Sequence, residues 1–216
     1  MTPEGAVTRR QARAERTRTR ILDAGEECFA AEGFERTRLE DVAGKVGVRR
    51  GAIFHYFAGK RELYEAVLIR LGESLMRRLR EAVAEQESLP DRFEAAVLTW
   101  IDFAGERPTF PRLILHLAAD ASPEDRPIVE RFGSPFMELL EQTFAEGERK
   151  GILKPLTRDP LQLASTLAGA TVFFLSAMPA LTPTRGFDPL RPELFEAHRR
   201  DALAIARRLV GIREAD

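Results

Sequence analysis

Hydrophobic residues recur every three or four positions along most of this chain, which is the pattern of amphipathic helices. Near the start, Ile21, Gly25, Cys28 and Phe29 share one helical face. The two-residue alternation typical of half-buried strands does not extend over any useful length, and no internal repeat is visible. The sequence therefore predicts an all-α protein with about nine helices.

The stretch from Phe34 to Tyr64 predicts two short helices joined by a tight turn. Thr37 and Glu40 have the spacing of a capping box, so we expect the first helix to begin there. Gly47 can adopt the positive φ that a sharp turn requires. The apolar stripe of the first helix consists of Leu39, Val42, Ala43 and Val46, and that of the second consists of Val48, Ile53 and Phe57. Together these features predict a helix-turn-helix.

The other face of the second helix carries hydrogen-bond donors, an aromatic edge and a glycine, which cannot all be buried. Arginine pairs bidentately with guanine in the major groove, and glycine allows a close approach of the backbone. Lys60, at the start of the next helix, is expected beside the phosphates. The competing interpretation is a solvated charged face on an ordinary helical core. The candidate DNA-binding residues are Thr37, Arg49, Arg50, Gly51, Phe54, His55, Tyr56 and Lys60.

The same stretch resembles the N-terminal pattern of the TetR family of bacterial transcriptional regulators. Two positions depart from that pattern: Arg49 stands where the family usually has Ser or Thr, and Phe54 where it usually has Tyr. The resemblance implies three N-terminal helices that bind DNA, two final helices that form a four-helix dimer interface, and middle helices that enclose a small-molecule pocket. Beyond about Leu71 it rests on helix count and order alone. The matching positions are Thr37, Val42, Ala43, Gly47, Val48, Gly51, Ile53, Tyr56, Phe57, Lys60 and Leu63.

Charge and periodicity divide the chain into three parts. Residues 1–15 are rich in arginine and lack periodicity, so we expect a disordered basic arm that grips phosphate or remains a solvated tail. Residues 16–60 form the predicted DNA-binding domain, whose first helix begins at Arg16 and closes at Gly33. Residues 61–216 form a larger helical domain for effector binding and dimerisation, which a long helix starting at Arg61 enters from the first domain.

Several boundaries in the second domain follow from start and stop signals. Ser122 and Pro123 predict a helix start, and Gly133 and Pro135 are expected to bend or break that helix. A helix from Leu161 to Met178 is apolar nearly all round, and the last helix begins at Pro192. The apolar surface of these two helices exceeds what one subunit of this size covers, so we predict a homodimer held by both.

Large aromatic side chains are numerous in the second domain. Some of them are predicted to line a cavity for a small, mostly apolar or aromatic effector, and the alternative is a filled aromatic core. His116 lies in an apolar helix, where it is either a core histidine or a group that orients the ligand. The candidate effector-binding residues are Thr99, Trp100, Phe103, His116, Phe136 and Phe173.

Composition narrows the class of protein. The chain has 216 residues, is 44% hydrophobic, and carries a formal net charge of −1 and one cysteine, Cys28, which is expected to be a core thiol. No apolar run approaches the ~20 residues of a membrane span and no signal region is seen, so we expect a cytoplasmic protein without a membrane partner. His55, His116 and His198 lie far apart and no catalytic motif is present. We therefore expect no enzyme, metal or cofactor.

These observations favour a repressor that binds a double-stranded, palindromic DNA operator as a dimer and leaves it when a small molecule occupies the second domain. One alternative is a constitutive or architectural DNA-binding protein without an effector. Another is an interaction protein whose apolar second domain holds a protein partner.

Overall fold

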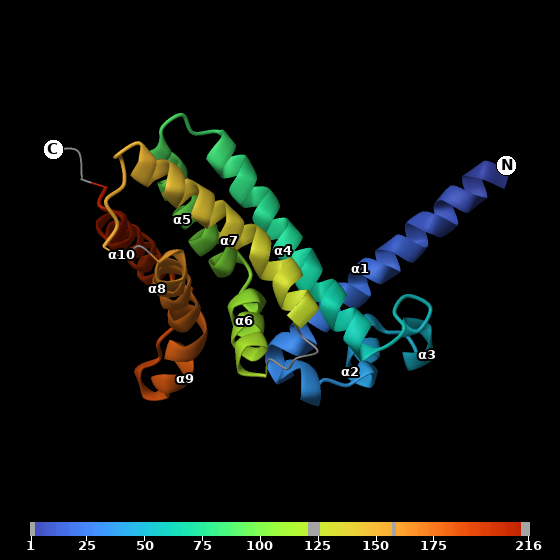
Figure 1. Ribbon diagram of the computed structural model, residues 1–216. Helices are drawn as coiled ribbons and strands as arrows, with labels where there is room; N and C mark the ends of the chain where they lie inside the picture. Colours follow the sequence, from blue (N-terminus) through green and yellow to red (C-terminus); the bar gives the residue numbers. More distant parts are fainter. Residues whose placement is uncertain (1–2, 121–125, 157–158, 213–216) are drawn as a thin grey trace. The chain divides into compact units, whose positions relative to one another are not determined.

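The computed structural model describes residues 3–120, 126–156 and 159–212, and within these ranges it is helical with no strand (Figure 1). This confirms the predicted all-α class. The helices are α1 (Pro3–Arg36), α2 (Leu39–Val46), α3 (Arg50–Ile53), α4 (Lys60–Ala84), α5 (Leu89–Glu106), α6 (Thr109–Ala119), α7 (Arg126–Arg149), α8 (Pro160–Val172), α9 (Met178–Leu181) and α10 (Pro192–Val210). A π-helical segment, Phe173–Ala177, joins α8 to α9.

The chain forms two compact units, Met1–Arg70 and Leu71–Asp216. The sequence placed the boundary between residues 60 and 61, whereas it falls inside α4. The first turns of α4 belong to the first unit because they pack on α1. The ring of Tyr64 meets that of Phe29 edge-on, with 5.0 Å between centroids. A Cβ on Gly25 would lie 3.3 Å from Cγ of Leu63, so a larger residue there would press on α4.

The first fifteen residues were predicted to be a disordered arm, but α1 already begins at Pro3. The segment lacks an apolar stripe, yet alanine, arginine and glutamine are strong helix formers, and it continues directly into the packed part of α1. Gly33 has φ 75° inside the α1 range, so the regular helix ends where the sequence predicted.

The core of the first unit contains the two predicted stripes. Ile21, Phe29 and Val42 are fully buried where α1 packs on α2. Arg70 of α4 reaches back to α1, and its Nη1 and Nη2 donate to Asp23 and Glu26 at 2.6 and 2.8 Å. Cys28 is buried as expected, and burial raises the pKa of its thiol, which keeps it protonated and unreactive.

In the second unit, α7 runs from Arg126 to Arg149 as one helix, so neither Gly133 nor Pro135 breaks it. Proline removes one backbone donor and crowds the carbonyl of Arg131, but the loss of one helical hydrogen bond does not end α7. The predicted start signal at residues 122–123 lies outside the described residues.

Residues Pro160–Leu181 have the length and hydropathy of a membrane span, 22 residues whose most apolar 18-residue window has a mean hydropathy of 1.5, which corrects the expectation that no such run exists. Composition alone does not make a span, because the core helix of a globular protein passes the same test. Asp159 caps this helix by accepting from the N–H of Leu161 at 2.9 Å, and α8 packs against α5, α6, α7 and α10.

Helix α10 is fixed to α5 by two bidentate ion pairs. Arg199 donates to both carboxylate oxygens of Asp102 at 2.8 and 3.2 Å, and Arg207 donates to both oxygens of Glu94 at 2.7 and 2.6 Å. On the same side of α10, Ala206 and Val210 are fully buried. Apolar burial and paired charge therefore fix the same face of this helix.

Two glycines of α7 give opposite expectations for the same substitution. A Cβ on Gly147 would lie 3.0 Å from Cβ of the buried Leu153 and closer to the rest of its side chain, whereas a Cβ on Gly133 meets no atom of the described side chains within 4 Å. Gly147→Ala should lower the free energy of unfolding by ~1–3 kcal/mol. Gly133→Ala should raise it by ~0.5–1 kcal/mol, because alanine loses less entropy in a helix. Urea denaturation at one protein concentration measures both, and equal shifts would contradict this packing.

Candidate DNA-binding and effector sites

The helix-turn-helix is built by α2, a turn and α3. Gly47 has φ 74° and ends α2, and its N–H donates to carbonyls of the last turn. Arg49 is extended and precedes α3, which spans only Arg50–Ile53. The reading helix is therefore shorter than predicted, and its exposed side continues through the turn that follows it.

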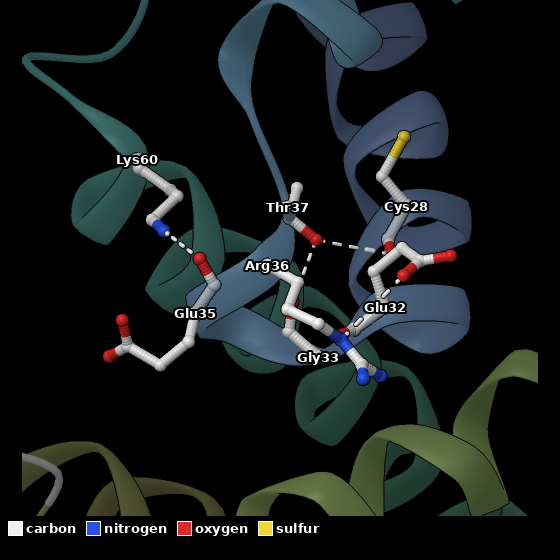
Figure 2. Close-up of polar contacts among 7 residues, drawn as sticks. All are labelled: Cys28, Glu32, Gly33, Glu35, Arg36, Thr37 and Lys60. Carbon is white, nitrogen blue, oxygen red and sulfur yellow. Dashed lines mark hydrogen bonds and ion pairs between the residues drawn. The ribbon is translucent and has the colours of Figure 1, made fainter.

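Thr37 does not cap α2. Its hydroxyl lies between the carbonyl oxygens of Gly33 and Cys28, at 2.7 and 3.2 Å, and the residue is only 2% exposed (Figure 2). The residue before α2 is Arg38, which makes no side-chain cap bond. The capping box was a wrong prediction, because the hydroxyl is already engaged by the end of α1. In this structure the Thr37 side chain is therefore turned into the first unit and not to its surface.

Most of the other candidate DNA-binding residues lie on the surface. Arg49, Arg50, Gly51, Phe54 and His55 are exposed, and Tyr56 is half-buried. Ile53 points the other way and is fully buried, so one face of this short segment holds the unit together while the opposite face presents donors and rings.

Arg50 is already engaged in the absence of DNA. Its Nη1 lies 3.0 Å from a carboxylate oxygen of Glu40, and its guanidinium sits 5.6 Å from the centre of the Phe54 ring. The ion pair is exposed on both sides, where such pairs contribute little and exchange readily. Arg50 is thus held over the exposed face yet able to change partners.

Lys60 was expected beside phosphate, and its side chain also makes two contacts within the first unit. Its Nζ donates to the carbonyl oxygen of Glu35 at 3.0 Å (Figure 2). The same ammonium sits 4.5 Å from the centre of the Phe34 ring. These contacts join the start of α4 to the end of α1.

The second unit contains an apolar cavity of about 70 Å³. Its walls come from α4, α5, α7, α8 and α10, and the rings of Trp100 and Phe136 face one another there with 5.7 Å between centroids. The lining residues are Leu79, Val83, Arg92, Phe93, Ala96, Val97, Trp100, Ile101, Phe136, Leu139, Leu140, Thr143, Ala164, Leu167, Ala168 and Ala202.

Of the predicted effector-binding residues, only Trp100 and Phe136 line this cavity. Thr99 and His116 lie elsewhere. Phe103 is fully buried and packs edge-on against Phe110 at 5.0 Å, so it belongs to the solid core. Phe173 is 50% exposed on the π-helical segment. The many aromatic residues of the second unit therefore predicted a cavity, but they did not identify the rings that line it.

Sequence reasoning missed Arg92, the only charged lining residue among those described. A signal was present, because Arg92 follows Leu89 by three residues and precedes Ala96 by four, which places it on the apolar stripe of α5. A charge on such a stripe is unusual unless it has a partner. Within the described ranges, no three His, Cys, Asp or Glu residues are grouped to hold a metal ion.

The comparisons with known proteins agree with one another, because each finds bacterial regulatory proteins. Residues 21–67 match the family model described as bacterial regulatory proteins, tetR family. The HTH-type transcriptional regulator SrpR of Pseudomonas putida is 29% identical over 155 residues, which cover 68% of each chain.

Two solved structures show the same fold over nearly the whole chain. A bacterial regulatory protein in the tetR family from Rhodococcus RHA1 aligns with a TM-score of 0.73 and 19% identity, covering 92% of this chain and 98% of that one. The transcriptional regulator FadR from Bacillus subtilis, solved in complex with stearoyl-CoA, aligns with a TM-score of 0.70 and 16% identity, covering 91% and 99%.

The buried Thr37 hydroxyl should matter for stability. Thr37→Val keeps the shape but leaves two carbonyls without this donor, so the free energy of unfolding should fall by ~1–2 kcal/mol. Thr19→Val is the control: Thr19 is exposed and donates only to Glu15 O within its own helix, so its effect should stay within ~0.5 kcal/mol. Thermal unfolding monitored by circular dichroism gives both values, and an equal effect would contradict the structural role.

Proposed function

We propose that this chain, which belongs to the tetR family of bacterial regulatory proteins, is a cytoplasmic repressor that binds a palindromic operator as a dimer and is released by a small, mostly apolar molecule. The observation that carries the proposal is an apolar cavity lined partly by α4, the helix that begins beside the helix-turn-helix.

The DNA-binding part rests on the exposed face of α3 and the turn after it. Arg49 and Arg50 supply donors for guanine or phosphate, and Gly51 removes a side chain that would hold the backbone away from a base edge. Phe54 offers an apolar surface to a thymine methyl. The many arginines of α1 are available for contacts that raise affinity without specifying sequence.

Release requires a ligand that binds the DNA-incompetent state more tightly, because equal affinity for both states shifts nothing. Leu79 and Val83 of α4 line the cavity, so a ligand that separates its walls acts directly on α4. The walls from α5 and α10 are tied by bidentate ion pairs, whereas α7, which contributes Phe136, Leu139, Leu140 and Thr143, is joined to α4 by a longer, exposed ion pair of 3.9 Å between Arg131 and Glu73. Expansion therefore displaces α7 and α4.

The size of the cavity favours a second candidate, a constitutive regulator. Drug-sized ligands occupy sites of about 300–1,000 Å³, which is more than this cavity offers. A neighbour in fold was nevertheless solved in complex with stearoyl-CoA, which is larger than this cavity and supports a fold able to open around a ligand. We therefore favour a cavity that is closed without its ligand.

Dimerisation through α8 and α10 is supported by apolar side chains that one chain leaves uncovered. Leu161 is 62% exposed at the start of α8, and Phe173 and Ile205 are each 50% exposed. Only 22% of the most apolar window in Pro160–Leu181 is buried within one chain. A second copy related by two-fold symmetry covers this surface and matches a palindromic operator.

Arg50 is proposed to read a base. Arg50→Ala should weaken specific binding by ~1–3 kcal/mol and relax the preference at one base pair. Glu40→Gln frees Arg50 from its ion pair and removes a negative charge, so it should strengthen binding to all duplexes. Arg77→Ala removes an exposed arginine of the second unit and serves as the control. Selection from a random duplex pool followed by titration measures all three, and an unchanged preference in Arg50→Ala would refute this role.

The proposed dimer can be split at one position. Ile205→Arg places an unpaired charge in the interface, which should weaken association by more than ~3 kcal/mol. Ala118→Arg adds the same charge to an exposed position of α6 and should leave the dimer intact. Sedimentation at micromolar concentration distinguishes the species. A monomer in the unmodified protein, or an intact dimer in Ile205→Arg, would contradict the interface.

Effector release has a direct optical test, because Trp100 is the only tryptophan and lines the cavity. Its fluorescence should change saturably with some member of a panel of lipophilic compounds, and the same compound should release the operator in a gel-shift assay. Ala168→Phe fills the cavity and should abolish both effects while leaving operator binding intact. Specific operator binding that no compound reverses would favour the constitutive regulator.

A further inference from the structure

Three polar groups stand out in the otherwise apolar lining of the cavity. They are the guanidinium of Arg92, the indole N–H of Trp100 and the hydroxyl of Thr143. The first two are donors only. The Thr143 hydroxyl already donates to the carbonyl of Leu139 at 2.8 Å, so only its lone pairs remain.

The indole Nε1–H of Trp100 is buried and has no acceptor among the residues that the structure describes. Such a group costs free energy unless an acceptor reaches it, and most buried polar groups in native proteins have one. Because Trp100 lines the cavity, a ligand that opens it further and brings an oxygen to this N–H would satisfy the donor.

Arg92 is half-buried on the apolar stripe of α5. Its Nε donates to the carbonyl of Gln86 at 3.0 Å, which orients the guanidinium, and no described residue accepts from its two Nη nitrogens. The charge of Arg92 helps to lower the pKa of Glu146. The larger cause is the hydrogen bond that Lys150 Nζ donates to Glu146 Oε1 at 2.5 Å. The outer edge of the guanidinium therefore remains available to another anion.

The charge of the lining is one-sided. None of the described lining residues is Asp, Glu or His, so nothing in the cavity compensates a cationic ligand, and Arg92 repels one. A carboxylate accepts two parallel bonds from a guanidinium, and such bonds are the strong ones.

We propose that the effector of this cavity is an amphipathic anion, with an apolar body between Trp100 and Phe136 and an anionic oxygen group held by Arg92, while a further acceptor or the same group meets the Trp100 N–H. This inference rests on the proposed function and names the chemical class of its effector. It excludes lipophilic cations and ranks neutral compounds below acids of the same shape.

Matched compounds test the charge of the ligand. Isothermal titration calorimetry of the full-length protein with decanoate, decan-1-ol and decyltrimethylammonium compares one chain length with three head groups, and 2-naphthoate with 2-naphthol compares an aromatic body. The acids should bind about ten-fold or more tightly than the alcohols, and the cation should not bind measurably.

Variants assign that preference to residues. Arg92→Gln should bring acid and alcohol to similar affinity, and Arg92→Lys should restore part of the difference. Arg77→Gln makes the same charge change outside the cavity and should keep the preference. Trp100→Phe should weaken acid and alcohol alike, by about three-fold or more, because both offer an acceptor. An unchanged melting temperature of each variant shows that it is folded.

The outcomes separate this inference from the proposed function. If alcohols bind as tightly as acids and release the operator, or if Arg92→Gln keeps the acid preference, the anionic class is wrong while the effector-responsive repressor stands. If decyltrimethylammonium binds more tightly than decanoate, the anionic class is also wrong. If no compound of either body binds, both the anionic class and an effector in this cavity are refuted.

Discussion

The second unit depends on the way α10 is fixed to α5. Each of two arginines of α10 places two nitrogens on one carboxylate of α5, and buried alanine and valine side chains fill the space along the same face. Bidentate pairs constrain both distance and orientation. One face of α10 therefore packs within its own chain, whereas Ile205, on another face, is 50% exposed and belongs to the surface proposed for a second copy.

Because these ion pairs hold only α5 and α10, the helices that line the cavity are not all fixed equally firmly. Helix α5 supplies Arg92 and Trp100 from a wall that is tied to α10. Helix α7 faces them and contains Pro135, where one helical hydrogen bond is missing. In the proposed mechanism, a ligand larger than about 70 Å³ is held by the α5 wall and accommodated by displacement of α7. Because α4 also lines the cavity, the proposed displacement acts on the helix whose first turns belong to the first unit.

Much of the fold could be predicted because burial decides helical periodicity, as in α5 and in the stripe of α2. The failures have physical causes. Thr37 had the local pattern of a cap, but its partners on α1 are tertiary contacts that spacing does not reveal. Phe103 and Phe173 looked like cavity residues, yet one lies in the solid core and the other on the surface. Arg92 could have been found as a charge on an apolar stripe.

The central claim is that the cavity and the DNA-reading face are linked, and linkage is reciprocal. The most direct measurement is the affinity of one effector, by calorimetry, for the free protein and for the protein saturated with its operator. The operator should weaken effector binding by the same factor by which the effector weakens operator binding, about five-fold or more. Equal effector affinity in the two states would contradict the claim, whatever the identity of the effector.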